Sequence, residues 1–322
     1  MTSPTAPVAS PRTDGPPSPP VRRSWAAGTG FSHTVLVANL VAQVLIVVTG
    51  GIVRLTASGL GCSTWPQCEP GHFTPVRHAE ASWHPYIEFG NRTITGLLLV
   101  LAGATAWVVW TRRDRSAAYR RLGLVPLALV VLQALVGGVI VRWGLPPALV
   151  GLHFLISMAL VGVSTALLRR HREADGAPVP LVGARPRLVA RVLGPLCALV
   201  LVLGVVVTGA GPHSGDDTVG YRLALDPATM ARVHSAAVWL YLAGVVTLLL
   251  SVRREGAPAG VRRAATVLLG VTLLQGVIGY VQYLTDLPAA LVATHMLGAS
   301  LLVVAQVSAV LSLRRREPAP VV

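Results

Sequence analysis

Residues 132–153 read LQALVGGVIVRWGLPPALVGLH, and residues 274–295 read LQGVIGYVQYLTDLPAALVATH. The two stretches align without gaps at an offset of 142 residues, and ten of the 22 positions are identical. The shared positions include the pairs Gln133/Gln275, Pro146/Pro288 and His153/His295. The tetrapeptide VVTG at 47–50 likewise recurs at 206–209. These matches indicate that the chain is an internal repeat of two halves.

The sequence around both stretches is strongly apolar. Of the 322 residues, 53% are hydrophobic and only 12% are charged, whereas a soluble domain carries roughly 25% charged residues. The apolar residues form long runs, and a helix that crosses a bilayer needs about 20 of them. This composition excludes disordered proteins, nucleic-acid-binding modules and ordinary cytosolic enzymes. It indicates a polytopic protein of the lipid bilayer.

We expect eight membrane-spanning helices and therefore an all-α fold of two four-helix bundles. The expected spans are 32–54, 88–110, 121–141, 149–168, 189–211, 230–252, 264–284 and 289–313. Seven of the 24 prolines fall before them, and we expect a disordered tail over residues 1–31. The other expected parts are an N-terminal bundle (32–168), a linker loop (169–188), a C-terminal bundle (189–313) and a second tail (314–322). No basic segment followed by an apolar run opens the chain, so we expect no cleaved signal peptide.

The arginines predict how the chain is oriented. All 27 basic residues are arginine, and 21 of them lie in one set of segments: the N-terminal tail, the loops 111–121, 169–191 and 253–263, and residues 314–316. By the positive-inside rule this side is cytoplasmic, and so are both termini. Each half then enters the membrane with the same polarity, which predicts an axis along the membrane normal. The net charge of +14 therefore reflects membrane orientation and not a nucleic-acid partner.

Three histidines lie inside the expected spans, a few residues after the outer end of a helix: His153, His234 and His295. Ionisable residues within a membrane are costly and are functional candidates by default. Two histidines at equal depth on different helices can supply both axial nitrogens of a haem iron. A single such histidine is more often a hydrogen-bonded packing residue. Three at matched depth, two of them related by the repeat, favour haem binding.

The second expected helix lacks the histidine that the repeat would place there. It reads IEFGNR, with Glu88, Asn91 and Arg92. Glu88 and Asn91 lie about one helical turn apart, on the same face of the helix. Asparagine is not a usual ligand of haem iron, and Glu88 taken alone would be an ordinary interfacial carboxylate.

The three cysteines are too few for a disulfide scaffold. Cys62 and Cys68 lie in the first outer loop, GLGCSTWPQCEPG. Two cysteines this close on the oxidising side of a bacterial membrane favour a disulfide, either as a loop staple or as a redox-active pair. Cys197 lies in an apolar helix and is expected to be inert. The outer-side arginines could pair with carboxylates of a ligand or extend from helix ends into the headgroup region.

Together, these motifs resemble the haem A synthase (heme A synthase) family. The matching stretches are GGIVRLTASGLGCSTWPQC, IEFGNR, the GLH of the fourth helix, TGAGPHSGD, the VH of the sixth helix and the THM of the eighth. The resemblance covers about residues 33–313. It implies an eight-helix oxidoreductase of the bacterial plasma membrane. This enzyme converts haem O to haem A for haem-copper oxidases, oxidising a ring methyl to a formyl group by hydroxylation and loss of water.

The resemblance also implies roles for the histidines. His234 and His295 resemble the pair that ligates a haem b cofactor in the C-terminal half. His153 resembles one of two histidines beside the substrate haem in the N-terminal half, and the other family histidine falls at Asn91. That departure leaves three alternatives: an open coordination position, a different ligand, or a weaker site.

Other roles follow from the same resemblance. Glu88 matches the family's functionally important glutamate, and Asn91 and Arg92 would line the substrate pocket. Cys62 and Cys68 match its outer-loop cysteine pair, whereas a second pair often found in the third outer loop is absent. The implied partners are haem O, the haem O synthase (a farnesyltransferase) that makes it, and an unidentified electron donor.

Two other functions compete with this interpretation. A non-enzymatic dihaem cytochrome would need redox centres near both membrane faces, but the three histidines lie near one face. A transporter built from paired repeats places its sites near the midplane on broken helices, and the spans show no mid-membrane charge.

Overall fold

The computed structural model describes residues 29–77, 82–213 and 215–317. Most of the expected N-terminal tail (1–31) lies outside these ranges. Its last three residues are described, and they begin the first helix instead of ending a tail.

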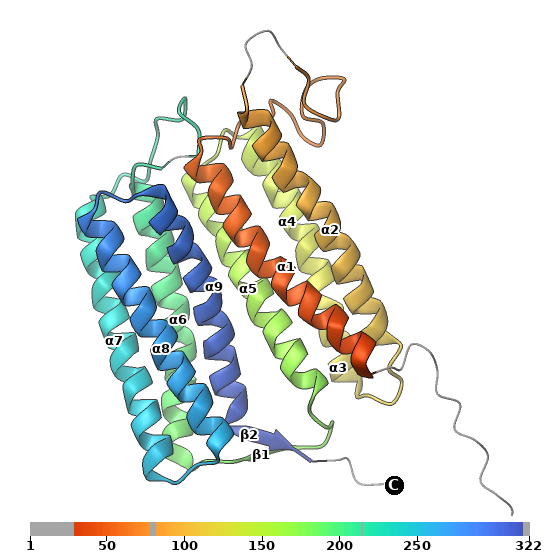
Figure 1. Cartoon of the computed structure of the whole chain (residues 1–322), viewed down its shortest axis with the longest axis vertical. Helices are drawn as coiled ribbons and strands as arrows, with labels where there is room; N and C mark the ends of the chain where they lie inside the picture. The colour runs from red at the N-terminus through yellow and green to blue at the C-terminus, as the bar shows by residue number, and fades with distance from the viewer. Residues whose placement is uncertain (1–28, 78–81, 214, 318–322) are drawn as a thin grey trace, which may run out of the picture.

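The described residues are mostly helical (Figure 1). The helices are α1 (Thr29–Leu55), α2 (His84–Trp110), α3 (Ala117–Leu122), α4 (Val125–Arg142), α5 (Pro147–His171), α6 (Ala184–Ala210), α7 (Pro227–Arg254), α8 (Ala259–Leu284) and α9 (Ala289–Ser312). Eight helical segments are long and apolar enough to cross a membrane, with α3 and α4 together forming one of them. The chain is therefore a multi-pass all-α membrane protein, and the eight expected spans are confirmed. Most helices begin a few residues earlier than predicted.

The third span is not the continuous helix that the sequence predicted. Helix α3 ends at Leu122, and α4 begins at Val125 after a turn at Gly123 and Leu124. Pro126 lies in the first turn of α4. Proline has no N–H to donate to the preceding turn, so it favours the start of a helix over its interior. The short α3 is capped by Ser116, whose hydroxyl accepts a hydrogen bond from the Tyr119 amide at 3.3 Å.

The helices form two groups of four that lie side by side (Figure 1). Helices α1, α2, α4 and α5 pack together, and so do α6, α7, α8 and α9. Helix α9 packs against both α1 and α5, and α5 also packs against α6. The shared interface is apolar, with Met158 and Val161 of α5 in one buried cluster with Val303 of α9. The symmetry axis that the repeat predicts stays a prediction.

The two repeated stretches fold into the same helix–turn–helix. Gly144 and Leu145, between α4 and α5, have φ values of 66° and 59°, and the matching Asp286 and Leu287 have 59° and 57°. Left-handed backbone is costly for residues with a side chain. It is nevertheless repeated here, because the Leu145 amide bonds back to the fifth residue before it at 2.9 Å and the Leu287 amide does the same at 2.8 Å.

A short two-stranded sheet, which the sequence did not predict, lies at the other end of the molecule from this turn. Strand β1 (Pro178–Pro180) is part of the linker between the halves, and it pairs antiparallel with β2 (Arg314–Arg316), which follows α9. The Leu181 amide extends the pairing with a 2.8 Å bond to the Leu313 carbonyl. The sheet therefore ties the linker to the segment that follows the final span.

Candidate functional site

The three intramembrane histidines lie near the same end of the helices that carry them. His153 and His295 each come six residues after the first residue of their helix, Pro147 of α5 and Ala289 of α9. His234 comes seven residues after Pro227, the first residue of α7. These three helices all start at the end that carries the disulfide loop (Figure 1). The chain thus places three imidazoles at similar depth.

The C-terminal half holds two of them, His234 and His295. The Nδ1 atom of each is buried, and that of His295 has no hydrogen-bond partner among the described residues, whereas the His234 ring lies beside the backbone carbonyl of Val200 on α6. On the neighbouring helix α8, Gln275 donates from Nε2 to the backbone carbonyl of His295 at 3.0 Å, which fixes the backbone that carries this imidazole.

Glycines of adjacent helices lie against both rings. A Cβ atom at Gly204 of α6 would come within 3.2 Å of the His234 Cε1, and one at Gly279 of α8 within 3.2 Å of the His295 Cε1. Larger residues would therefore press on the imidazoles. Two half-buried rings at similar depth on different helices, with glycine beside each, suit the axial ligation of a haem, for which histidine is a common ligand.

The N-terminal half repeats part of this arrangement around His153. Its Nδ1 is buried without a partner among the described residues, and a Cβ at Gly137 of α4 would lie 3.6 Å from its Cε1. Gln133 donates from Nε2 to the His153 carbonyl at 2.9 Å, as Gln275 does in the other half. Gln133 also contacts the hydroxyl of Ser157. One imidazole of this half therefore has the same backbone support as His295.

The position in the N-terminal half that corresponds to His234 is not a histidine. Asn91 lies seven residues after the start of α2, as His234 does in α7. The Asn91 Oδ1 accepts a hydrogen bond from the hydroxyl of Thr49 on α1 at 2.8 Å. Its side chain is thus tied to the neighbouring helix.

Glu88 is buried, with 5% of its surface exposed, one turn before Asn91. Its Oε2 accepts from the backbone amide of Cys62 at 2.7 Å. Its Oε1 accepts from the guanidinium of Arg92, with the Nε atom at 3.1 Å. The carboxylate is therefore paired with one arginine and bonded to the start of the disulfide loop.

The predicted disulfide is confirmed. Cys62 and Cys68 are joined and both are fully buried. Arg92 donates from Nη1 to the carbonyls of Thr64 and Gln67, at 2.9 and 3.1 Å. The loop between the cysteines is therefore held against α2.

A second attachment holds the same loop against α4. Arg142 donates to the Trp65 carbonyl at 2.9 Å. The Trp65 ring lies against Gly138, where a Cβ atom would come within 2.6 Å of it. The loop therefore lies across the end of the N-terminal bundle where α1 ends and α2 begins. Nothing in the sequence marks Trp65, Arg142 or Gly138 as part of this attachment, because it depends on how the loop packs on α4.

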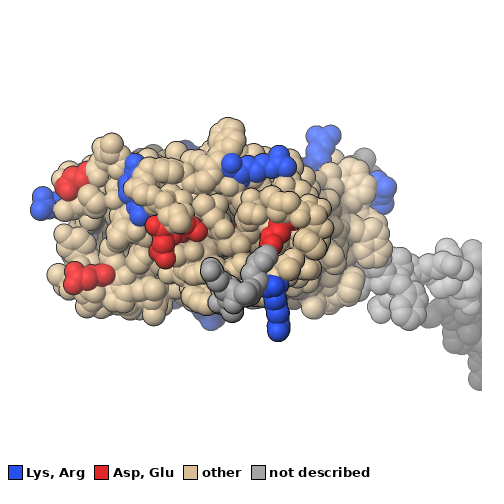
Figure 2. Space-filling model, turned by 90° about the horizontal axis from the view of Figure 1, so that it is seen from above, with Lys and Arg blue, Asp and Glu red and all other residues tan. Residues whose placement is uncertain are grey.

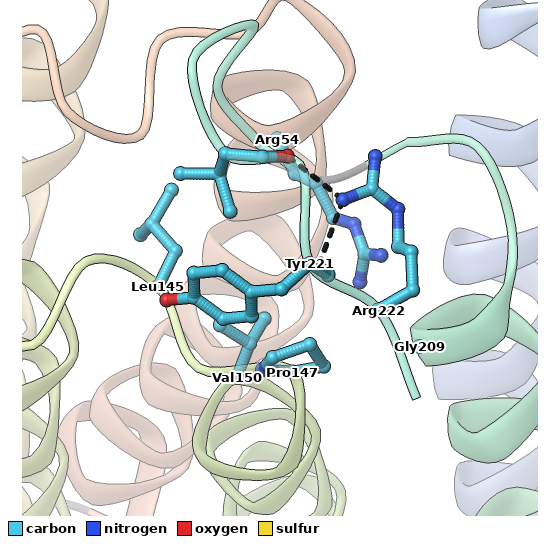
Figure 3. A pocket seen from close by; sticks show the side chains of 8 residues that line it. Arg54, Leu145, Pro147, Val150, Gly209, Tyr221 and Arg222 are labelled. Atoms are coloured by element: carbon cyan, nitrogen blue, oxygen red, sulfur yellow. Dashed lines mark hydrogen bonds between the residues drawn. The ribbon is translucent and has the colours of Figure 1, made fainter. Parts of the chain in front are cut away.

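Two further arginines at this end bind backbone carbonyls at the end of α6 and in the loop that follows it. Arg54 at the end of α1 donates to the carbonyls of Thr208 and His213, and Arg222 donates to those of Gly211 and Pro212. Together with Tyr221 they surround a small cavity (Figure 3). The guanidinium groups therefore hold the loop between α6 and α7 in place.

Charged side chains of both signs are scattered over this end of the molecule (Figure 2). Of the loop histidines, His84 bonds to Ser58 at 2.9 Å, and His213 lies 3.3 Å from the carbonyl of Leu287. His78 lies outside the described residues. Within the described ranges, no group of three or more His, Cys, Asp or Glu residues is placed to hold a metal ion.

Comparisons with known proteins agree with the sequence motifs. The family model COX15-CtaA, described as "Cytochrome oxidase assembly protein", matches residues 33–307. The chain is 34% identical over 124 residues to the heme A synthase of Lysinibacillus sphaericus, covering 38% of this chain and 39% of that protein. It is 30% identical over 139 residues to the heme A synthase of Geobacillus kaustophilus, covering 41% of each. The aligned stretch spans less than half the length of these relatives.

Proposed function

Because the chain belongs to the COX15-CtaA family of cytochrome oxidase assembly proteins, we propose that it is a haem A synthase. It would be an oxidoreductase that converts the ring methyl of haem O to the formyl group of haem A by successive hydroxylation. The observation that carries this proposal is the set of three half-buried imidazoles at similar depth, two in one bundle and one in the other. The bacterial plasma membrane is the proposed location.

The C-terminal bundle would hold haem b as a cofactor, with His234 and His295 as its axial ligands. When bound, this haem supplies one-electron transfer. Gly204 and Gly279 leave the space beside the two rings free of side chains. Gln275 holds the backbone at His295, so that the imidazole does not have to be positioned by the haem itself.

The N-terminal bundle would bind the substrate haem O beside His153. Asn91 and Arg92 would line this pocket, and Asn91 would not serve as an iron ligand. Its carboxamide oxygen is already bonded to Thr49, and asparagine lacks the imidazole nitrogen that haem iron prefers. This arrangement leaves one face of the substrate open for the reaction.

Glu88 would be the catalytic carboxylate of this pocket. A carboxylate has about four acceptor sites, and the Cys62 amide and the Arg92 guanidinium occupy up to three of them. These bonds orient the carboxylate. The remaining site would accept a proton from the hydrated product or stabilise positive charge that develops at the oxidised carbon.

The substrate would come from a haem O synthase, the farnesyltransferase that precedes this reaction, and an unidentified donor would supply electrons. The decisive experiment is co-expression with a haem O synthase in a host that makes no haem A, followed by chromatography of the extracted haems. We expect haem A from the wild-type chain and none from His153→Ala.

A dihaem electron-transfer cytochrome is the alternative function, and the same extraction separates it. Such a protein would show bound haem in its absorption spectrum but would yield no haem A. The shared depth of the three histidines argues against it, because transfer across the membrane needs centres near both faces.

A further inference from the structure

A second cavity, open and of about 470 Å³, lies at the arginine-rich end, away from the three intramembrane histidines. Three segments far apart in the sequence line it: Gly30 and His33 in the first turns of α1, Arg112 after α2, and His171 and Arg172 at the end of α5. Its volume falls within the range of small-molecule pockets, about 300–1,000 Å³. The cavity therefore has room for a ligand that is unrelated to haem chemistry.

His33 is one of the residues that line the cavity. The Nη2 atom of Arg172 lies 2.9 Å from the His33 Nε2. A guanidinium only donates hydrogen bonds, so Nε2 accepts and the proton of the neutral ring is on Nδ1. That Nδ1 is buried without a partner among the described residues. The His33 ring also stacks on His171, which is held by Tyr119 at 3.0 Å. His33 is thus a fixed N–H donor without an acceptor within residues 29–77, 82–213 and 215–317.

Arg112 also lines the cavity. Its Nε and Nη2 atoms donate to Asp114 at 3.0 and 2.9 Å. Its Nη1 is buried and has no partner within the described part of the chain. A buried donor without an acceptor costs about 1–3 kcal/mol. Two such donors among the residues that line one cavity point to an acceptor beyond the described part of the chain.

The charges of the cavity specify what kind of acceptor this is. Arg112 and Arg172 both line it, and no carboxylate is among the described residues that do so. Gly30 leaves open space in the first turn of α1, where the helix amides have no intrahelical partner and attract anions. Two arginines and several N–H donors form the pattern that recognises phosphate oxygens.

We propose that this cavity binds a phosphate group, supplied by the headgroup of an anionic phospholipid. The cavity lies where α1 begins and where α2 and α5 end, which is the level of the lipid headgroups for helices of this length. The excess of arginine at this end predicts that it faces the cytoplasmic leaflet, which is rich in anionic lipids. Free inorganic phosphate has the same chemistry and is the other source to be tested.

The experiment measures binding of short-chain phosphatidylglycerol, phosphatidylcholine and inorganic phosphate to the purified full-length protein in detergent by calorimetry. We expect phosphatidylglycerol to bind wild type, and Arg112→Gln to bind it at least about tenfold more weakly, since a charge-assisted hydrogen bond is lost. Arg113→Gln is the matched control, because Arg113 is the exposed neighbour that does not line the cavity. Phosphatidylcholine should bind more weakly, because its choline places a positive charge near two arginines.

A second variant tests the other donor. His33→Phe keeps a ring to stack on His171 and leaves the Arg112–Asp114 pair intact, but it removes the N–H donor, so it too should weaken phosphatidylglycerol binding. Equal affinity of wild type, Arg112→Gln and His33→Phe for phosphatidylglycerol would overturn the site. Inorganic phosphate that binds as tightly as the lipid and displaces it would overturn the lipid as its source.

Discussion

A histidine in an apolar helix is stable only if its polar atoms are satisfied, because an unpaired buried polar group costs a few kcal/mol. His153 and His295 each keep a buried Nδ1 without a partner within the described ranges, whereas the His234 ring lies beside the Val200 carbonyl of α6. The two histidines related by the repeat are thus left with an unpaired polar atom inside apolar helices. Their shared environment supports the proposal that they face a bound ligand.

The first prediction concerns the pair in the C-terminal half. His234→Ala and His295→Ala should each abolish the absorption of low-spin haem b in the purified protein, because each removes one of the two proposed axial ligands. His153→Ala is the control and should retain that absorption. A wild-type low-spin spectrum in both alanine variants would show that these residues are not the ligands.

The second prediction separates chemistry from positioning at Glu88. Glu88→Ala and Glu88→Gln should both retain haem b but stop at haem O or its hydroxylated intermediate, because both remove the negative charge. Glu88→Gln keeps an oxygen that can accept from the Cys62 amide, so it preserves that attachment of the disulfide loop. Chromatography of extracted haems measures the result, and near-normal haem A from Glu88→Gln would mean that Glu88 acts only by holding the loop.

The third prediction is that Asn91→Ala keeps substantial haem A formation. The substitution removes a hydrogen bond to Thr49, worth about 1 kcal/mol, but no proposed iron ligand. The measurement is again the haem A content of cells that also express a haem O synthase. Complete loss of haem A, with haem b retained, would assign Asn91 a direct role in the substrate site.

At the scale of the elements, the disulfide loop joins the start of α2 to the end of α4 across one end of the N-terminal bundle. The fourth prediction is that Cys62 and Cys68 resist alkylation in non-reduced, rapidly trapped membranes, while reduction exposes two reactive thiols. Closure of so short a loop stabilises it by about 2–3 kcal/mol in the chain-entropy model. Mass spectrometry of the alkylated peptides measures this, with buried Cys197 as the thiol that reacts only after denaturation. Two alkylated cysteines without reductant would contradict the bond.

The spans could be predicted because a bilayer requires long apolar runs, and that signal is local. Helix starts such as Ala184 and Ala259 could not, since the turns before each run contain arginine or glycine and give no hydrophobic pattern. The β1–β2 pair was also unpredictable. Two three-residue strands rich in proline and arginine carry no alternation, and their pairing depends on a contact between distant segments.

The proposed ligands of the site could be predicted for a similar reason, because histidine inside an apolar run is conspicuous. The residues around them were partly visible: Gln133 and Gln275, like Gly137 and Gly279, are identical in the repeat. The function of these residues could not be predicted, because the packing of the helices determines which glutamine reaches the backbone of the next helix. Gly204 has no counterpart in the repeated stretch, and the sequence offered no signal for it.

At the scale of the whole molecule, a cluster of ion pairs connects the loops of the arginine-rich end. Asp175 accepts from the Arg115 Nε at 2.6 Å, from the Ser116 amide at 2.8 Å and from Arg170 at 3.0 Å. Arg316 of β2 donates to the Gly176 carbonyl at 3.0 Å. The loop after α2, the linker after α5 and the segment after α9 are thus held in one network.

The fifth prediction is a pH dependence of this network. Partial burial raises the pKa of Asp175, but the hydrogen bonds from Arg115 and Ser116 outweigh it and lower the pKa from 3.8 to about 2. The stabilisation is therefore complete above about pH 4 and is lost as the pH falls through about 2. In detergent, Asp175→Asn should have a lower thermal unfolding midpoint than wild type at pH 6, and the difference should shrink towards pH 2. Asp217→Asn, at the other end, is the control, and a gap that does not change with pH would rule out this linkage.

The small sheet has a consequence for how the protein is made. Strand β1 leaves the ribosome when half of the spans exist, but its partner β2 follows the eighth span. Because segments fold in the order of their synthesis, the N-terminal bundle can assemble while its linker still lacks a partner strand. β1 and β2 can therefore pair only after the last span has been synthesised. A ribosome that stalls before α9 leaves a nascent chain whose linker backbone stays unpaired and accessible to quality-control proteases.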